Sequence, residues 1–353
     1  MSLALQLAAR GLYTTDPNPR VGCVLVRDEK VVGEGWHQRA GEAHAEVLAL
    51  QAAGEQARGA CAFVTLEPCS HTGRTPPCAD ALIAAGVARV CCASVDPNPL
   101  VSGAGIARLK AAGIEVSVGP LAAAARELNA GFFSRFERSR PYLRLKLAMS
   151  LDGRTAPPGG KRAWITGEAA RADVQHWRAR SSVVMTGAGT VRSDNPRLDV
   201  RLAYGDWVRQ PLRVVLDPDL RCSPAADIFK DHGALLMVAS DAAPRERGAL
   251  RMQRVARAPA GLDLAAVVAI LQEQAANEVL VECGPRLAAS FLRARLVDEL
   301  IMYVAPHFLG PDAAPLADLR VLALGEAMPA FDFHEMRRVG ADLRILLKPR
   351  AVQ

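Results

Sequence analysis

The chain has 353 residues, of which 50% are hydrophobic and 23% charged, with a formal net charge of +6 and a pI near 9.0. The length predicts about two domains, and the composition is that of an ordinary soluble globular protein. Aromatic residues make up only 5% and the arginines form no block, which disfavours a base-stacking nucleic-acid platform and fits an anionic small molecule.

Residues 1–19 do not have the form of a secretory signal, because they lack a basic n-region and a small-residue cleavage site. They are predicted to form a short amphipathic helix. No apolar run reaches the roughly 18 residues of a membrane span. We therefore expect a cytoplasmic protein without a membrane partner, whose eight cysteines are reduced thiols. Four of these cysteines are expected in the core: Cys23, Cys61, Cys91 and Cys92.

Residues 21–137 alternate between strand-like and helix-like segments, which favours a layered α/β domain with a largely parallel part. Residues 21–37 are predicted to form two strands joined by a turn at Asp28–Lys30. Further strands are expected at 61–69, 88–95 and 114–119, and helices at 44–54, 78–87, 103–113 and 122–137.

A polar, proline-containing break at residues 138–142 is the predicted domain boundary and divides the chain into 1–139 and 140–353. The α/β pattern then restarts, so the predicted fold class is two layered α/β domains. Strands are predicted within 143–155, 182–191, 212–220, 234–240, 278–285, 301–310 and 341–349, and helices at 167–181 and 286–300.

His44, Cys69 and Cys78 form a candidate metal site. Cys69 follows a strand and Cys78 opens the next helix, each directly after a proline. One nitrogen and two sulfur ligands suit zinc and leave a fourth position for water. A thiolate at a helix N-terminus is stabilised by the helix dipole. Glu46, two residues beyond His44, could move protons there without binding the metal.

The H-x-E motif of zinc nucleobase deaminases is intact at residues 44–46, whereas eight residues separate the two cysteines instead of two. Residues 17–26, 33–46 and 67–78 together resemble the deaminase domain of the bifunctional riboflavin-biosynthesis deaminase–reductases, and the resemblance covers residues 1–138. It implies a cytidine-deaminase-like fold, zinc bound by His44, Cys69 and Cys78, and Glu46 as the catalytic proton shuttle.

Three alternatives accompany this interpretation. The cluster of His44 and the two cysteines could be a structural zinc site or a loop without metal. His71 could be a competing ligand, face the substrate or stabilise the loop. Asn18 is a candidate substrate-binding residue, with a simple Asx turn as its alternative.

In the second part, strands at 183–187 and 279–283 run into glycine turns. Such turns let backbone amides approach a phosphate, although residues 187–189 lack the third glycine of the Rossmann fingerprint. Five blocks resemble the reductase domain of the same family, which has a dihydrofolate-reductase-like fold: residues 145–156, 163–181, 186–201, 281–292 and 296–310. The resemblance covers residues 141–350, but no block lies within 202–275.

This resemblance implies NADPH as cofactor and a ribosylaminopyrimidine phosphate as substrate. Lys146 and Asp194 are the candidate catalytic pair, with a surface lysine and an Asx turn as alternatives. Arg221 is a candidate for the contact that selects NADPH. The residues expected to face the dinucleotide are Ala148, Trp164, Thr190, Asp194, Gly284, Pro285, Arg286, Leu287, Ala288, Ala289 and Ser290. Those expected to face the substrate of this domain are Arg162, Arg178, Leu198, Arg201 and Glu282.

Together the two domains imply two consecutive reactions. The first is hydrolytic deamination of 2,5-diamino-6-(5-phosphoribosylamino)pyrimidin-4-one. The second is NADPH-dependent reduction of the ribosyl group of 5-amino-6-(5-phosphoribosylamino)uracil to ribityl. The resemblance also implies a homo-oligomer, and the few aromatic residues predict that the protein binds no nucleic acid.

Two other functions stay open at this point. A nucleic-acid base deaminase with an RNA-binding second half predicts the shorter cysteine spacing and a basic, aromatic second half. A zinc-stabilised binding protein without activity predicts that Glu46 has no role in turnover.

Overall fold

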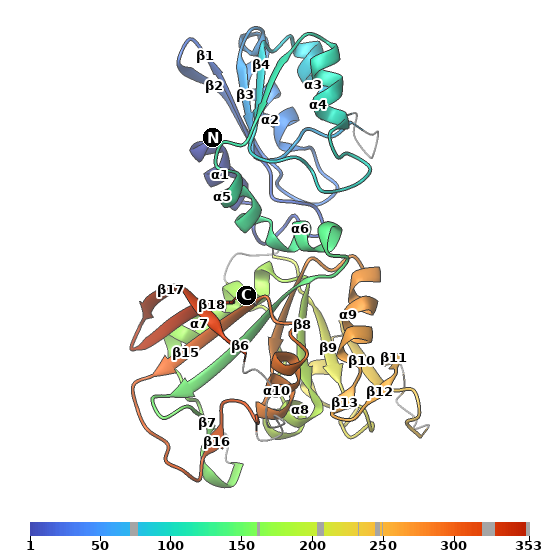
Figure 1. Ribbon diagram of the computed structural model, residues 1–353, viewed down its shortest axis with the longest axis vertical. Helices are drawn as coiled ribbons and strands as arrows, with labels where there is room; N and C mark the ends of the chain where they lie inside the picture. The colour runs from blue at the N-terminus through green and yellow to red at the C-terminus, as the bar shows by residue number, and fades with distance from the viewer. Residues whose placement is uncertain are drawn as a thin grey trace. The chain divides into compact units, whose positions relative to one another are not determined.

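The computed structural model describes residues 1–70, 77–160, 163–202, 208–231, 233–243, 248, 250–319 and 329–350. They form two compact units, Met1–Arg140 and Pro141–Gln353, each with its own sheet (Figure 1). None of the helices in these described ranges is long and apolar enough to cross a bilayer.

The sheet of the first unit has the strand order β2-β1-β3-β4-β5. Its strands are β1 (Gly22–Arg27), β2 (Lys30–Trp36), β3 (Cys61–Val64), β4 (Arg89–Cys92) and β5 (Glu115–Val118). The predicted hairpin is confirmed, with Asp28 and Glu29 at positive φ in its turn. β1 is antiparallel to β2 and β3, whereas β3, β4 and β5 are parallel.

The helices of the first unit are α1 (Ser2–Ala9), α2 (Ala45–Ala53), α3 (Cys78–Ala85), α4 (Ala104–Ala111), α5 (Ala122–Leu128) and α6 (Ala130–Glu137). The predicted helices at the N-terminus and within 44–54, 78–87 and 103–113 are confirmed. α2 ends at Gly54 and α3 at Gly86, both at positive φ, and Gly86 has the left-handed conformation with which a glycine commonly terminates a helix.

The continuous helix predicted for residues 122–137 is wrong, because the chain breaks at Asn129 into α5 and α6. Asn129 is 1% exposed. Its side chain accepts a hydrogen bond from the Arg20 backbone N–H at 2.8 Å and donates one to the Arg20 carbonyl at 2.9 Å. A contact across 109 residues therefore overrides the local helical pattern.

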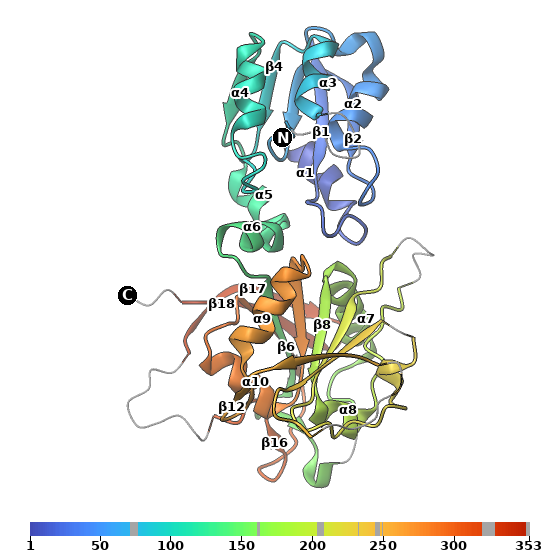
Figure 2. The ribbon, with the colours of Figure 1, turned by 90° about the vertical axis from the view of Figure 1, so that its right-hand side faces the viewer.

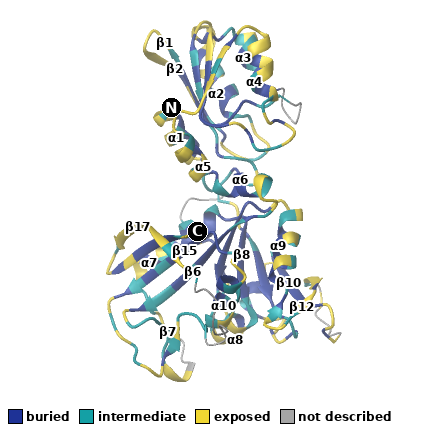
Figure 3. Cartoon of the chain, viewed as in Figure 1, coloured by how far each residue is buried: buried dark blue, intermediate teal, exposed yellow. Residues whose placement is uncertain are grey.

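Small residues make up much of the core of the first unit, where Ala45, Ala49 and Ala53 of α2 are buried. β2 and α2 approach each other closely at Gly35. A Cβ on this glycine would lie 2.3 Å from the Ala45 carbonyl oxygen, so a larger residue would not fit there. Cys23, Cys91 and Cys92 are buried as predicted, whereas Cys61 is only half-buried. Figure 3 shows the inner strands of both sheets as largely buried, whereas the edge strands carry exposed residues.

The sheet of the second unit has the strand order β11-β10-β9-β8-β14-β6-β15-β18-β17. It is parallel from β11 to β15, and β18 and β17 continue it in antiparallel pairing. β8, β10 and β14 are almost wholly buried, which explains their continuous apolar sequences. The bounds are β6 (Tyr142–Ser150), β8 (Val183–Gly187), β9 (Leu212–Leu216), β10 (Ala234–Ala239), β11 (Arg251–Val255), β14 (Glu278–Glu282), β15 (Glu299–Ala305), β17 (Phe331–Val339) and β18 (Asp342–Pro349).

The helices of the second unit are α7 (Glu168–Arg180), α8 (Ala188–Asp194), α9 (Leu264–Glu273) and α10 (Pro285–Arg293). Figure 2 shows α9 and α10 in front of the strands of the large sheet. Two short ladders complete the unit, β12 (Arg257–Ala258) with β13 (Gly261–Leu262) and β7 (Arg154–Ala156) with β16 (Ala314–Pro315).

The structure corrects two predictions for the second unit and adds two elements. The glycine turn expected after residue 187 is the start of α8. The helix expected over 286–300 ends at Arg293, since the sequence from Glu299 pairs with β6 as β15. α9 and β17 were not predicted.

Candidate functional site

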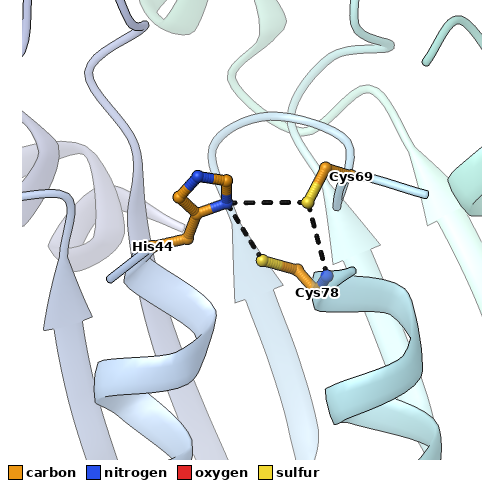
Figure 4. A group of neighbouring side chains, drawn as sticks. All are labelled: His44, Cys69 and Cys78. Atoms are coloured by element: carbon orange, nitrogen blue, oxygen red, sulfur yellow. Dashed lines mark hydrogen bonds between the residues drawn. The ribbon is translucent and has the colours of Figure 1, made fainter. Parts of the chain in front are cut away.

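His44, Cys69 and Cys78 lie together in the first unit (Figure 4). One nitrogen or sulfur atom from each residue lies within 4.8 Å of the others. The His44 Nδ1 atom is 3.2 Å from the Cys78 sulfur and 3.5 Å from the Cys69 sulfur. His44 is the N-cap of α2, and Cys78 is the first residue of α3. The start of two helices and the loop after β3 therefore converge on one point.

The two thiols of this cluster are electrostatically different. The hydrogen bond from Cys78 lowers the pKa of Cys69 to about 4, and His44 acts in the same direction. The hydrogen bond with Cys69, together with burial, raises the pKa of Cys78. The backbone N–H of Cys78 donates to the Cys69 sulfur at 3.3 Å. The cluster is thus built to hold thiolate charge, as a site for a soft cation requires.

Glu46 lies in the first turn of α2 and is 3% exposed. Burial raises the pKa of its carboxyl group to about 7, while the charges of His44 and Cys69 also act on it. The carboxyl group therefore faces the cluster from a nearly dry position. A carboxyl group with a pKa close to neutrality is suited both to accept and to donate a proton.

His37 is a residue of this site that the sequence analysis missed. It is 3% exposed and its ring packs edge-on against His44 at 5.4 Å between centroids. Burial lowers the pKa of His37. Its Nδ1–H donates to the Ala43 carbonyl at 3.1 Å, because a carbonyl oxygen can only accept a hydrogen bond. Its Nε2 then accepts from the Asn18 amide at 3.1 Å. His37 therefore orients Asn18, and the only sequence signal was a histidine at the end of the hairpin.

The second unit contains a cavity of about 1200 Å³ at the carboxyl ends of its parallel strands. Four neighbouring strands contribute to its lining. The residues are Lys146 of β6, Cys283 directly after β14, Gly187 of β8 and Asp217 directly after β9. The predicted site residues that line it are Lys146, Ala148, Trp164, Arg178, Thr190, Asp194, Leu198, Glu282, Gly284, Pro285, Arg286, Leu287 and Ser290.

Arg178, Glu282 and Lys146 form an ionic cluster in the wall of this cavity. Arg178 Nε and Nη2 donate to the two carboxylate oxygens of Glu282 at 2.5 and 3.0 Å. Lys146 is the register partner of Glu282 on the adjacent strand, and its Nζ lies 3.9 Å from that carboxylate. Burial lowers the pKa of Lys146. Burial acts against ionisation of Glu282 as well, but the charges of Arg178 and Lys146 lower its pKa overall.

Lys146 and Asp194 both line the cavity, and Lys146 is not a surface residue, since its side chain is 18% exposed. Within the described ranges, no hydrogen bond or ion pair joins the two side chains, and the ionic partner of Lys146 is Glu282.

Three predicted site residues lie away from the cavity lining. Ala288 and Ala289 are fully buried, because they occupy the face of α10 that packs on the sheet. The Arg201 side chain is 61% exposed and lies 3.7 Å from Asp199. Arg162 and His71 fall outside the described residues. Arg221 lines the cavity near the end of β9, with an ion pair to Asp219 at 2.9 Å.

Two different family models match the two parts of the chain. Residues 1–94 match the cytidine and deoxycytidylate deaminase zinc-binding region, and residues 141–344 match the RibD C-terminal domain. The riboflavin biosynthesis protein RibD of Escherichia coli is 48% identical over 354 residues, a match that covers 97% of this chain and 96% of that protein. The chain belongs to the RibD family.

Solved structures of RibD proteins have the same fold across the whole chain. The RibD of Acinetobacter baumannii superposes with a TM-score of 0.92 at 43% identity, covering 99% of this chain and 97% of that one. A second solved structure is that of a diaminohydroxyphosphoribosylaminopyrimidine deaminase/5-amino-6-(5-phosphoribosylamino)uracil reductase from Thermotoga maritima. It superposes with a TM-score of 0.87 at 31% identity and covers 99% of this chain and 97% of that one. The chain is thus a bifunctional deaminase–reductase of riboflavin biosynthesis with the predicted deaminase and RibD-type reductase folds.

The residues present fit the two cofactors of the RibD family, zinc and NADPH. The nitrogen and two sulfurs of the first unit are the donor set that zinc prefers, with a position left for a reactant. The cavity of the second unit exceeds the roughly 300–1,000 Å³ of most ligand sites. Its lining includes the N-terminus of α10, which suits dinucleotide phosphates.

Proposed function

We propose that residues 1–139 deaminate 2,5-diamino-6-(5-phosphoribosylamino)pyrimidin-4-one and that residues 140–353 reduce the ribosyl group of the product. The name of the Thermotoga maritima relative supports these two substrates. The observation that carries the first step is the convergence of two thiols and an imidazole beside the buried Glu46. Ammonia release from this substrate by the purified chain tests it.

His44, Cys69 and Cys78 are proposed to hold the zinc ion. When bound, zinc is a Lewis acid that makes water a nucleophile near neutral pH. Glu46 takes one proton from the attacking water and delivers it to the pyrimidine ring nitrogen. It then takes the second proton from the hydroxyl group that has been added and delivers it to the departing amine, which leaves as ammonia. Its pKa of about 7 supports both directions of transfer. Asn18, oriented by His37, is proposed to bind the pyrimidine.

The cavity of the second unit is proposed to bind NADPH and the ribosyl phosphate together. NADPH supplies the hydride. The start of α10 is proposed to contact the dinucleotide through Gly284, Pro285, Arg286, Leu287 and Ser290, together with Ala148, Trp164 and Thr190. Lys146 and Asp194 are proposed to move the proton that opens the ribose ring. The substrate contacts proposed for this site are Arg162, Arg178, Leu198, Arg201 and Glu282.

Replacing Asp194 by alanine should slow reduction and spare deamination. Loss of a charged hydrogen-bonding group at the reacting centre is expected to lower kcat/KM for reduction by about 10–100-fold. NADPH absorbance with the deaminated substrate measures reduction, and ammonia release measures the other site. Asp332→Ala on the exposed strand β17 is the matched control. The reverse pattern, slow deamination with normal reduction, would show that Asp194 is wrongly assigned.

The remaining parts of the proposal concern partners and location. We propose a cytoplasmic homo-oligomer that acts on small molecules and binds neither nucleic acid nor membranes. Light scattering of the purified chain measures the oligomeric state. An RNA gel shift at low salt would reveal the base-deaminase alternative, and its absence at high RNA concentration would remove it.

A further inference from the structure

Glu67, two residues before Cys69, is a buried carboxylate that neither proposed reaction uses. It is 3% exposed. Its Oε2 accepts hydrogen bonds from the backbone N–H groups of Asp96 at 3.2 Å and Gly103 at 2.9 Å. Its Oε1 accepts one from the N–H of Ile106 at 3.1 Å. Three backbone donors that lie 29 to 39 residues further along the chain therefore converge on one side chain.

Two of these three donors, Gly103 and Ile106, belong to the start of α4. Gly103 is the N-cap of that helix and Ile106 lies in its first turn. The first N–H groups of a helix have no partner within the helix, and a carboxylate there is also favoured by the helix dipole. No side chain of the N-cap residue can serve, because that residue is glycine. Glu67 thus caps α4 from the segment that carries Cys69.

The contact between α4 and this segment is also unusually close. A Cβ on Gly105 would lie 2.0 Å from the carbonyl oxygen of Pro68, the residue directly before Cys69. Only glycine permits that approach. The backbone N–H of Glu67 is held in turn by the Ser94 carbonyl at 2.9 Å. The segment that leads into Cys69 is therefore held by contacts with α4 and by a hydrogen bond to Ser94.

α4 also contacts the far side of Cys69 and the helix that carries Cys78. Arg108 of α4 donates through Nη1 to the Ser70 carbonyl at 3.3 Å. Its Nε lies 2.5 Å from Oδ1 of Asp80, in the first turn of α3. α4 consequently holds the residues before and after Cys69 and the helix that begins at Cys78.

We propose that Glu67, with Arg108, is a positioning residue that sets the distance and direction between the two cysteine ligands. The inference rests on the proposed zinc ligation by Cys69 and Cys78. A metal binds more tightly when its ligands are already ordered, and substitutions of residues that orient ligands cost about 10–100-fold in metal affinity. Glu67 touches neither substrate nor metal, so its effect must appear in zinc retention.

The test compares Glu67→Gln with the parent chain and with Glu115→Gln, the same change at an exposed carboxylate of β5. The glutamine keeps the size of the side chain but replaces one acceptor oxygen by an amide nitrogen. Zinc release to a chromophoric chelator should be about 10–100-fold faster in Glu67→Gln and unchanged in Glu115→Gln. The visible spectrum of the Co²⁺-loaded variant should differ from that of the parent. NADPH oxidation should be unaffected.

Melting temperatures separate positioning from plain stabilisation. A positioning role reduces the gain in melting temperature that zinc produces, because the metal binds less tightly. A purely structural role lowers the melting temperatures of the zinc-free and zinc-loaded protein by the same amount and leaves the rate of zinc release unchanged. That result would overturn the inference. If Glu67→Gln fails to fold, the half-exposed Arg108 offers a second test. Arg108→Met should also speed zinc release, and the conservative change Arg108→Lys should restore much of the zinc retention. Unchanged release in Arg108→Met would overturn the inference as well.

The parent chain distinguishes this inference from the proposed function. If the parent binds no zinc, the proposed deaminase site is wrong. If the parent binds zinc and Glu67→Gln holds it equally well, only the positioning role is wrong.

Discussion

Glu46→Gln is expected to abolish deamination while zinc stays bound and the fold is kept. The glutamine has the same shape as the buried glutamate but cannot take the proton of the attacking water. General acid–base catalysis contributes about 10²–10⁴-fold, and one group serves several transfers here, so kcat should fall by at least about 10³-fold. Ammonia release measures turnover, and metal analysis of the purified variant measures zinc.

The control for this change is Glu42→Gln, an exposed glutamate four residues earlier in the loop that leads into α2. It should leave ammonia release unaltered. Normal turnover in Glu46→Gln would contradict the mechanism and favour a zinc-stabilised site in which Glu46 is merely buried. Loss of zinc together with activity would show that Glu46 maintains the metal site instead.

Cys69→Ser is expected to lose zinc and deamination and to retain reduction. A serine hydroxyl stays protonated at neutral pH, whereas the Cys69 thiol ionises readily because the hydrogen bond from Cys78 lowers its pKa. Even substitutions of residues that only orient a ligand cost about 10–100-fold in affinity, so loss of a ligand should exceed a hundredfold. Metal analysis, ammonia release and NADPH oxidation with the deaminated substrate measure the three properties.

Cys61→Ser, at a half-buried cysteine of β3 away from the cluster, is the matched control and should keep both activities. Loss of reduction as well in Cys69→Ser would mean that the two units do not function independently. Full zinc occupancy in that variant would remove Cys69 from the ligand set.

The alternation of strands and helices was predictable where local sequence decides the structure. Apolar strands bounded by turns, and helices closed by Gly54 or Gly86, have their causes within a few residues. The break at Asn129 has its cause in hydrogen bonds to Arg20, which no local pattern contains. β17 was missed because a strand is recognised from the sequence by apolar residues on a buried face. The residues of β17 are largely exposed on both faces, so this signal is weak.

The metal cluster could be predicted because each ligand lies in a short motif at the start of a helix or after a strand. His37 and Glu67 could not be assigned a role, since their partners lie 19 to 39 positions away. In the second unit, the pairing of Lys146 with Glu282 depends on the register between β14 and β6, which sequence alone does not show. Ala288 and Ala289, which were predicted to face the dinucleotide, are fully buried in the structure, a burial that depends on how α10 packs in the fold.

The most direct test of the whole account follows ammonia and NADPH absorbance together. The purified chain is given the diaminopyrimidinone ribosyl phosphate and NADPH, with and without prior removal of zinc. We expect ammonia to appear first, NADPH to fall after it, and zinc removal to stop both, since reduction then lacks its substrate. Ammonia release without any fall in NADPH would contradict the assignment of the second unit, and deamination that survives zinc removal would contradict that of the first.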